Sequence, residues 1–148
     1  MQTISRLHRS GVGIAPDRTL SDVAKLMDSS GVGSIAVLDE DRLLGIVTDR
    51  DLVRRGLARD LPTDTRVDSV MSSPVLTSDA HSPLHDAVDT FAQHAVRRLA
   101  VVDDGRFIGM VSLDDLLLDL AGDLRSLTAP LAAELASPQR DSPLPVAT

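Results

Sequence analysis

The chain has 148 residues, enough for one compact domain or for two small ones. Apolar residues make up 43% of it, which allows a core, and the lack of cysteine excludes disulfides and thiolate chemistry. A net charge of −7 disfavours broad binding to nucleic acid or to a membrane surface, because both need a basic face. Phe91 and Phe107 are the only phenylalanine, tyrosine or tryptophan residues, so a planar ligand would need aliphatic walls.

No stretch of the sequence reaches the roughly 20 apolar residues that span a membrane. The N-terminal segment MQTISRLHRSG lacks the long apolar run that is typical of a secretion signal. We therefore expect the protein in the cytoplasm.

The first half of the chain alternates strand and helix patterns. A short strand is predicted at Val12–Ala15, and a helix follows Thr19, because apolar residues then recur at i, i+3, i+4 and i+7. Thr19 and Asp22 have the spacing of a capping box, which fixes the start of this helix. The strands Ser34–Leu38 and Leu43–Val47 are predicted to form a tight hairpin, and a second helix follows directly.

The second half repeats this order of elements. Its first strand is predicted at Val75–Thr77, and its first helix has Ser82 as the N-cap and Pro83 at the first helical position. A hairpin and another helix follow in the segments RLAVVDDGRFIGMV and SLDDLL. Short helices are expected at Val67–Met71, before the second half, and at the matching place Ile4–His8.

An internal repeat relates the two halves. When the chain is shifted by 64 positions, residues 20–54 align with residues 84–118 without a gap, and 11 of the 35 pairs are identical. Chance would give about two identities. The identical pairs begin at these residues of the first half: Leu20, Asp22, Val32, Ala36, Val37, Asp39, Arg42, Gly45, Val47, Asp51 and Leu52. One folding unit of the order β-α-β-β-α therefore occurs twice.

The repeat sets the expected domain organisation along the chain: a first repeat at 1–58, a linker at 59–66, a second repeat at 67–122, and a C-terminal helix with a disordered tail at 123–148. We expect the last helix to be interrupted at Pro130, and the tail, rich in proline and serine, to begin at about Ser137. Units of about 60 residues bury too little surface to be robust alone. The two repeats are therefore expected to pack sheet to sheet around a shared core.

Each repeat ends in the motif G-h-h-[S/T]-x-x-D, where h is an apolar residue. The two copies are GIVTDRD at Gly45–Asp51 and GMVSLDD at Gly109–Asp115, behind the matching hairpin segments VGSIAVLDED and VRRLAVVDDG. In these features the chain resembles a CBS (cystathionine-β-synthase) domain pair of the stand-alone type, and the resemblance covers residues 4–122. It implies an α/β (α+β) fold in which tandem β-α-β-β-α repeats form a pseudo-twofold CBS pair, or Bateman module.

The resemblance also implies a function. Such pairs are regulatory or sensor modules without catalytic activity, and they bind an adenosyl ligand in clefts between the two repeats. The expected ligand is AMP, ADP or ATP, or in some cases S-adenosylmethionine, and no other cofactor is expected. The expected partners are a second copy, in a homodimer, and a protein effector that receives the signal.

Four motif residues are the candidates for ligand contact. Asp51 and Asp115 can accept hydrogen bonds from the two hydroxyls of a ribose. Thr48 and Ser112 stand at helix starts, which suit a phosphate. The same spacing is that of a capping box, so the alternative is that these residues only cap helices. In that case the protein is a ligand-free dimerisation scaffold.

Arginines are the candidates for phosphate counter-charges. Arg97 and Arg98 stand at the start of the second hairpin, and Arg50 lies on the helix after the first motif. The second motif has Asp114 at the position of Arg50, so we expect one cleft, rather than two equal ones, to hold phosphate. The alternative is that these arginines pair with the abundant aspartates on a solvated face.

Aliphatic residues are the candidates for the walls around an adenine ring. They are Ile14 and Ile35 in the first repeat, and Leu76 and Leu99 in the second. The alternative for all four is a place in the core, because aliphatic residues on strands are usually buried.

The sequence does not indicate a metal site or an enzyme. His81 and His85 have i, i+4 spacing, but Pro83 lies between them and no third ligand is evident. There is no nucleophile–base pair and no glycine-rich phosphate loop. The last helix instead indicates association, because the run Leu116–Leu118 and Leu120 offer apolar surface that one pair cannot cover and a homodimer would bury.

Overall fold

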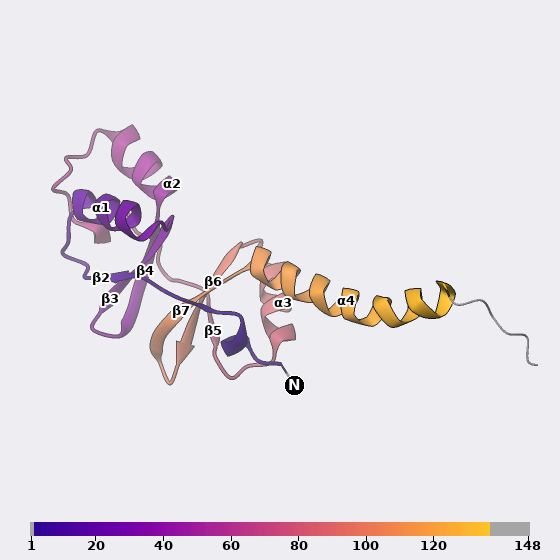
Figure 1. Ribbon diagram of the computed structural model, residues 1–148. Coiled ribbons are helices and arrows are strands. Elements are labelled where there is room, and N and C mark those ends of the chain that lie inside the picture. Colours follow the sequence, from indigo (N-terminus) through magenta and orange to yellow (C-terminus); the bar gives the residue numbers. More distant parts are fainter. Residues whose placement is uncertain (1, 137–148) are drawn as a thin grey trace, which may run out of the picture.

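The computed structural model describes residues 2–136 of the 148 (Figure 1). The chain forms two lobes, each built around one β-sheet, with α1 (Leu20–Ser30) on the first lobe and α3 (Leu84–His94) on the second. A long helix, α4 (Leu113–Ala136), leaves the second lobe and extends away from both. This mixed α/β architecture with two similar units confirms the fold class predicted from the sequence.

The first unit contains five elements in the predicted order: β2 (Gly13–Ile14), α1, β3 (Ser34–Asp39), β4 (Arg42–Thr48) and α2 (Asp49–Asp51). The predicted hairpin of β3 and β4 is confirmed. The helix after it is irregular, because α2 continues as a π-helical turn at Leu52–Gly56 and a 3-10 turn at Leu57–Arg59.

The second unit follows the same order: β5 (Thr77–Asp79), α3, β6 (Arg98–Asp103), β7 (Arg106–Ser112) and α4. Helix α3 begins differently from the prediction, since Pro83, and not Ser82, takes the N-cap position and makes no side-chain cap bond. The backbone N–H of Leu84 donates to the carbonyl oxygen of Gln2 at 3.0 Å. The N-terminal segment thus supplies the acceptor that Ser82 was expected to provide.

The two hairpins have the same register. Ile35 lies opposite Val47 in the first, and Leu99 lies opposite Val111 in the second. In both units the first strand adds in parallel to the hairpin, β2 beside β3 and β5 beside β6. Corresponding residues of the two repeats therefore occupy corresponding places, as the shift of 64 positions predicts.

The repeats exchange the segments that precede them. Strand β1 (Arg9–Ser10), which precedes the first β-α-β-β-α unit, pairs antiparallel with β7 of the second unit. The predicted short helices are 3-10 turns, Ile4–Arg6 and Val67–Ser69, and each lies on the repeat that it does not precede. The backbone N–H of Ile4 donates to the second repeat, at the carbonyl oxygen of Ser82 (3.2 Å). The backbone N–H of Val67 donates to the first repeat, at the carbonyl oxygen of Arg18 (2.8 Å).

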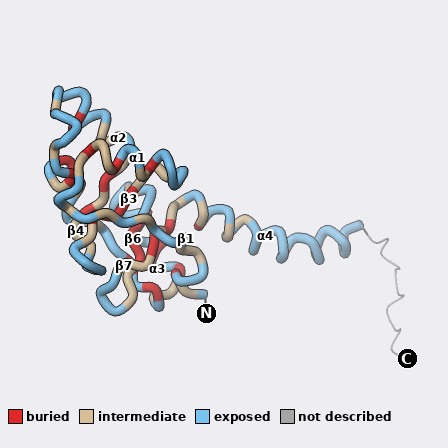
Figure 2. Tube along the Cα trace, turned by 60° about the vertical axis from the view of Figure 1, so that its left-hand side comes forward, coloured by how far each residue is buried: buried red, intermediate tan, exposed pale blue. Residues whose placement is uncertain are grey.

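Buried apolar residues form two clusters, one in each lobe. Figure 2 marks the buried residues in red along the backbone. Ile4 belongs to the cluster of the second repeat, and Val67 and Val70 belong to that of the first. The prediction of one shared core is therefore wrong. The exchanged segments explain the difference, because each one completes the core of the lobe on which it lies.

Helix α1 begins as the sequence predicts. The hydroxyl oxygen of Thr19 accepts from the backbone N–H of Asp22 (3.1 Å), and the Asp22 carboxylate accepts from the backbone N–H of Thr19 (3.2 Å), which confirms the capping box. The hydrogen bond that the Asp22 carboxylate accepts from the backbone N–H of Thr19 is the largest cause that holds the pKa of this carboxyl below its ordinary value. The helix ends at Gly31, whose φ of 65° is left-handed and suits glycine.

Helix α4 continues through Pro130, so the predicted interruption at this residue is wrong. Proline removes one backbone hydrogen bond of a helix. The segment after it, LAAELA, consists of strong helix formers, which sustain the helix to Ala136. The helix also runs without a break from residue 122 to residue 123, where we expected a new segment to begin. The predicted disordered tail from Ser137 lies outside the described residues.

Candidate functional site

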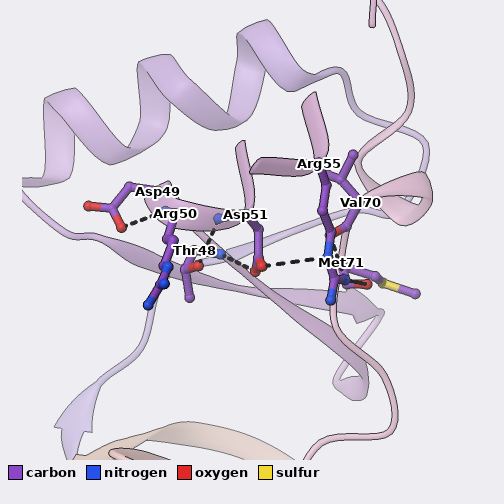
Figure 3. Close-up of polar contacts among 7 residues, drawn as sticks. All are labelled: Thr48, Asp49, Arg50, Asp51, Arg55, Val70 and Met71. Carbon is purple, nitrogen blue, oxygen red and sulfur yellow. Dashed lines mark hydrogen bonds and ion pairs between the residues drawn. The ribbon is translucent and has the colours of Figure 1, made fainter. Parts of the chain in front are cut away.

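Thr48 and Asp51 lie where β4 runs into α2 (Figure 3). The backbone N–H of Asp51 donates to the Thr48 hydroxyl oxygen (3.1 Å), and the backbone N–H of Thr48 donates to Asp51 Oδ2 (2.9 Å). The pair is therefore a complete capping box, as at Thr19 and Asp22. Asp51 Oδ1 lies 3.9 Å from Nε of Arg55, too far for a hydrogen bond, and 17% of the Asp51 side chain stays exposed.

Ser112 and Asp115 occupy the equivalent place in the second repeat, with a different set of bonds. The backbone N–H of Asp115 donates to the Ser112 hydroxyl oxygen at 3.0 Å. The Asp115 carboxylate accepts two hydrogen bonds from Arg9, from Nε at 3.1 Å and from Nη2 at 2.8 Å. Arg9 lies on the exchanged strand β1. A residue from the start of the chain is therefore already bonded to the carboxylate of the second motif.

The glycine that opens each motif lies where an exchanged segment crosses the sheet. A Cβ atom on Gly109 would collide with the carbonyl oxygen of Arg9, and one on Gly45 would lie 2.8 Å from the carbonyl oxygen of Ser72. Glycine allows backbones to approach this closely because it has no side chain. The exchange of segments thus explains why each motif begins with glycine.

A cleft of about 380 Å³ opens between the repeats beside Thr48 and Asp51, and we call it the first cleft. Arg97 and Arg98 line it from the second repeat. Its apolar wall is contributed by both repeats and the connection between them: Ile46, Val75, Leu76, Val96 and Met110. Its volume lies in the range of about 300–1,000 Å³ that is usual for small-molecule sites.

A second hollow, also of about 380 Å³, lies beside Ser112 and Asp115, and we call it the second cleft. Arg9 and Arg98 line it. Small residues make up much of the rest: Ser10, Gly11, Gly31, Gly33 and Ser34. The second cleft therefore offers a planar ring less apolar surface than the first, and its aspartate already has a cationic partner.

The predicted arginines separate into two places. Arg97 and Arg98 line the first cleft, and Arg98 borders the second as well. Arg50 lies in another hollow, of about 310 Å³, with three further arginines: Arg54, Arg55 and Arg59. Asp51 borders this hollow as well as the first cleft, whereas Arg50 does not line the first cleft. The structure thus removes Arg50 from the lining of the first cleft.

The four predicted wall residues also separate. Leu76 lines the first cleft. Ile35 and Leu99 are 1% and 0% exposed and belong to the two cores, so the prediction that they form ligand walls is wrong. They lie on the hairpin strands β3 and β6, where they face the core of their own lobe. Ile14 lines a different hollow, between β2 and α1.

Several cleft residues escaped sequence reasoning. Arg9, Ser72 and Val75 lie before or between the aligned parts of the repeats, so the shift of 64 positions does not pair them with a motif. Ser34 and Met110 are inside the alignment, but their positions read as ordinary strand residues. The exchange of segments brings Arg9 and Ser72 to the clefts.

Among residues 2–136, no group of three or more acidic or histidine side chains is placed to hold a metal ion. Nε2 of His81 lies 3.1 Å from Oδ1 of Asp103, and Nε2 of His85 lies 3.1 Å from Oδ1 of Asp86. In the same part of the chain, no helix combines the length and the apolar character that a membrane crossing requires.

Comparison with known protein families identifies the repeats. The family model of the CBS domain matches twice, at residues 5–58 and 67–122, which together are more than half of the chain. The chain belongs to the CBS domain family. The resemblance inferred from the two motifs is thereby confirmed, and the two lobes are its CBS repeats.

Similar proteins extend this assignment of a CBS pair. The "CBS domain-containing protein YhcV" of Bacillus subtilis is 36% identical over 106 residues, which cover 72% of this chain and 76% of the relative. The CBS domain protein PAE2072 of Pyrobaculum aerophilum, solved in complex with AMP, is 26% identical with a TM-score of 0.70, over 82% of this chain and 99% of that one. The structure of Hypoxic Response Protein I, with two coordinated zinc ions, is 29% identical with a TM-score of 0.71, over 80% and 99%.

Proposed function

We propose that this CBS pair is a regulatory module, and not an enzyme, that binds AMP, ADP or ATP in the first cleft and signals its occupancy to a partner protein. The composition of that cleft carries the proposal. It joins the carboxylate of Asp51, the guanidinium groups of Arg97 and Arg98 and an apolar wall around one hollow between the repeats. The AMP complex of the Pyrobaculum aerophilum relative supports this class of ligand.

Each part of an adenine nucleotide has a matching group in the first cleft. A carboxylate has about four acceptor sites, so Asp51 can keep its bond to the Thr48 backbone and still accept the two ribose hydroxyls. Arg97 and Arg98 offer positive charge to the phosphate. Leu76 and Met110 belong to the apolar wall that would hold the adenine ring.

The position of the cleft suggests how binding becomes a signal. Its walls come from both repeats, so a ligand that touches both favours one arrangement of the two lobes over others. A partner that recognises this arrangement would detect the bound nucleotide.

Isothermal titration with AMP, ADP and ATP tests the proposal. Asp51→Asn should weaken the tightest nucleotide at least about tenfold, because a hydrogen bond to a charged group contributes roughly 1.5–3 kcal/mol. Asp22→Asn is the matched control, since Asp22 sits in the same kind of capping box but does not line the first cleft. It should change the affinity less than about twofold. Arg98→Ala should also weaken binding, and an unchanged affinity would remove Arg98 from the site.

The second candidate function is a ligand-free dimerisation scaffold. The complete capping box at Thr48 and Asp51 favours it, and so does the ion pair of Arg9 with Asp115, because all four side chains then have a purely structural use. A ligand that binds only the folded state must raise the midpoint of thermal unfolding. An unchanged midpoint with millimolar AMP, ADP, ATP and S-adenosylmethionine would overturn the sensor function and favour the scaffold.

A further inference from the structure

Four arginines surround a hollow of about 310 Å³ that lies outside the two clefts, and we call it the arginine hollow. Its lining residues are Arg50, Asp51, Arg54, Arg55 and Arg59. Four of the 15 lysine and arginine residues thus gather in one place, in a chain whose net charge is −7. Charge of one sign around a concave surface raises the local concentration of ions of the opposite sign.

The irregular helix after β4 brings these arginines together. In a regular α-helix, positions 50 and 59 would lie about 180° apart and would face opposite sides. Here a π-helical turn at Leu52–Gly56 and a 3-10 turn at Leu57–Arg59 follow the short α2, and Arg50 and Arg59 line the same hollow. π-helical turns are rare and are frequent at functional sites.

Three of the four guanidinium groups have no acidic partner within residues 2–136. The side chains of Arg50, Arg54 and Arg59 are exposed and make no hydrogen bond or ion pair in that part of the chain. The chain has 22 aspartate and glutamate residues that could have supplied partners. Because like charges close together repel one another, an anion in the hollow would stabilise this arrangement.

Arg55 and Asp51 form the fixed side of the hollow. Nη1 of Arg55 donates to the carbonyl oxygens of Val70 (3.3 Å) and Met71 (3.2 Å), which hold its guanidinium group in place. Asp51 lies between Arg50 and Arg55 in the view of Figure 3. Its one carboxylate offsets one of the four positive charges, so the lining of the hollow keeps a positive surplus.

The other two aspartates of this segment do not remove the surplus. Oδ1 of Asp49 accepts from the backbone N–H of Arg50 (2.8 Å), and a Cβ atom on Gly33 would lie 3.1 Å from Oδ2 of Asp49. Neither Asp49 nor Asp60 lines the hollow. The arginines therefore remain open to an anion from outside the chain.

We propose that the arginine hollow binds a phosphoanion with two or more linked phosphate groups. A guanidinium group can donate two parallel hydrogen bonds to one phosphate, so four such groups exceed what a single phosphate needs. The lining contains no apolar residue that could form a wall for a ring. The volume of the hollow lies at the lower end of the range of about 300–1,000 Å³ for small-molecule sites, which suits a compact ion.

The diphosphate can belong to a free ion or to the tail of ADP, because Asp51 borders both the arginine hollow and the first cleft. The second source rests on the proposed function, whereas the first does not. In either case the site is distinct from Arg97 and Arg98, which line the first cleft and not the hollow.

Isothermal titration of inorganic pyrophosphate into the full chain tests the site without a nucleotide. Arg54→Gln and Arg59→Gln should each weaken pyrophosphate binding at least about tenfold, because each removes charge-assisted hydrogen bonds. Arg125→Gln is the matched control, since it removes the same charge from an exposed arginine on α4 that does not line the hollow. It should change the affinity less than about twofold, because salt screens distant exposed charges. Glutamine and arginine have similar helix propensities, so all three variants should fold.

Titrations of ADP and AMP identify the source of the diphosphate. If Arg54→Gln weakens ADP as well as pyrophosphate but leaves AMP unchanged, the hollow holds the tail of a nucleotide. If Arg54→Gln weakens pyrophosphate alone, the ligand is a free ion.

Three results would overturn the site. They are no binding of millimolar pyrophosphate to the native chain, an equal loss in Arg54→Gln and Arg125→Gln, and a loss in Arg98→Gln that Arg54→Gln and Arg59→Gln do not share. None of them bears on AMP in the first cleft, which is measured separately, so failure of the hollow and failure of the proposed function can be told apart.

Discussion

Arg9 holds the carboxylate of Asp115 through two hydrogen bonds of 2.8 and 3.1 Å. Arg9 lies opposite Met110 on β7, and the residue in the same relation to β4 is Ser72, which lies opposite Ile46. The exchanged segments therefore bring an arginine to the second motif and a serine to the first. The two clefts differ through these segments, although both motifs keep the hydroxyl and the aspartate.

Removal of Arg9 should free the second cleft. A ribose that binds Asp115 must displace the ion pair, so the native chain should fill the first cleft at low nucleotide concentration and the second only at higher concentration. Arg9→Met should raise the amount of AMP bound per chain from about one towards two, as measured by titration calorimetry. Arg18→Met, which breaks the exposed ion pair with Asp22, is the control and should leave the stoichiometry unchanged. If Arg9→Met binds no more AMP than the native chain, the ion pair does not block the cleft.

The two helix caps predict different losses of stability when the hydroxyls of Thr19 and Ser82 are removed. Thr19→Ala should lower the free energy of unfolding by about 0.5–2 kcal/mol, because its oxygen accepts a hydrogen bond from Asp22. Ser82→Ala should change it by less than about 0.5 kcal/mol, because α3 is capped at its start by the carbonyl of Gln2. Urea denaturation of the two variants makes the comparison. Equal losses would contradict the assignment of the two caps.

The motif glycines should tolerate no side chain. Gly109→Ala should destabilise the protein by about 1–3 kcal/mol, since the added methyl group meets the backbone of Arg9 and either the sheet or β1 must shift. Gly122→Ala should instead stabilise it by roughly 0.5–1 kcal/mol, because this glycine lies inside α4 with no atom near its Cβ position. Thermal unfolding of the two variants should give midpoints on opposite sides of the native value.

Asp22 should contribute to acid sensitivity. Its folded pKa lies below its ordinary value, so its stabilising contribution is present above the unfolded pKa and is lost as the pH falls through the folded value. Unfolding measured from pH 6 down to pH 2 should therefore show a loss below about pH 4 that is smaller in Asp22→Asn. An equally steep loss in the variant would assign the acid sensitivity to other carboxylates.

Most of the fold could be predicted from local sequence patterns. The capping box at Thr19 and the hairpins are set by neighbouring residues, and the repeat gave the second unit from the first. The crossing of Ile4 and Val67 to the opposite repeats could not be read from the sequence, since an apolar residue near a connection fits either sheet.

The candidate site was predictable to a similar degree. The motif placed Thr48 and Asp51 beside the first cleft, because both follow from the end of one strand. Arg9 was missed and Arg50 was misplaced for the same reason. A cleft between two lobes is closed by residues distant in sequence, and the side on which an arginine leaves a short irregular helix depends on the fold.

The exchange of segments also bears on the order in which a growing chain can fold. Val67 and Val70 complete the core of the first repeat soon after that repeat has been synthesised. Ile4 is made before either, yet its core partners lie between Ala80 and Leu116. During synthesis, which runs from the N-terminus, Ile4 therefore cannot complete its native contacts until the ribosome has passed Leu116. The oldest part of the nascent protein is among the last to reach its place.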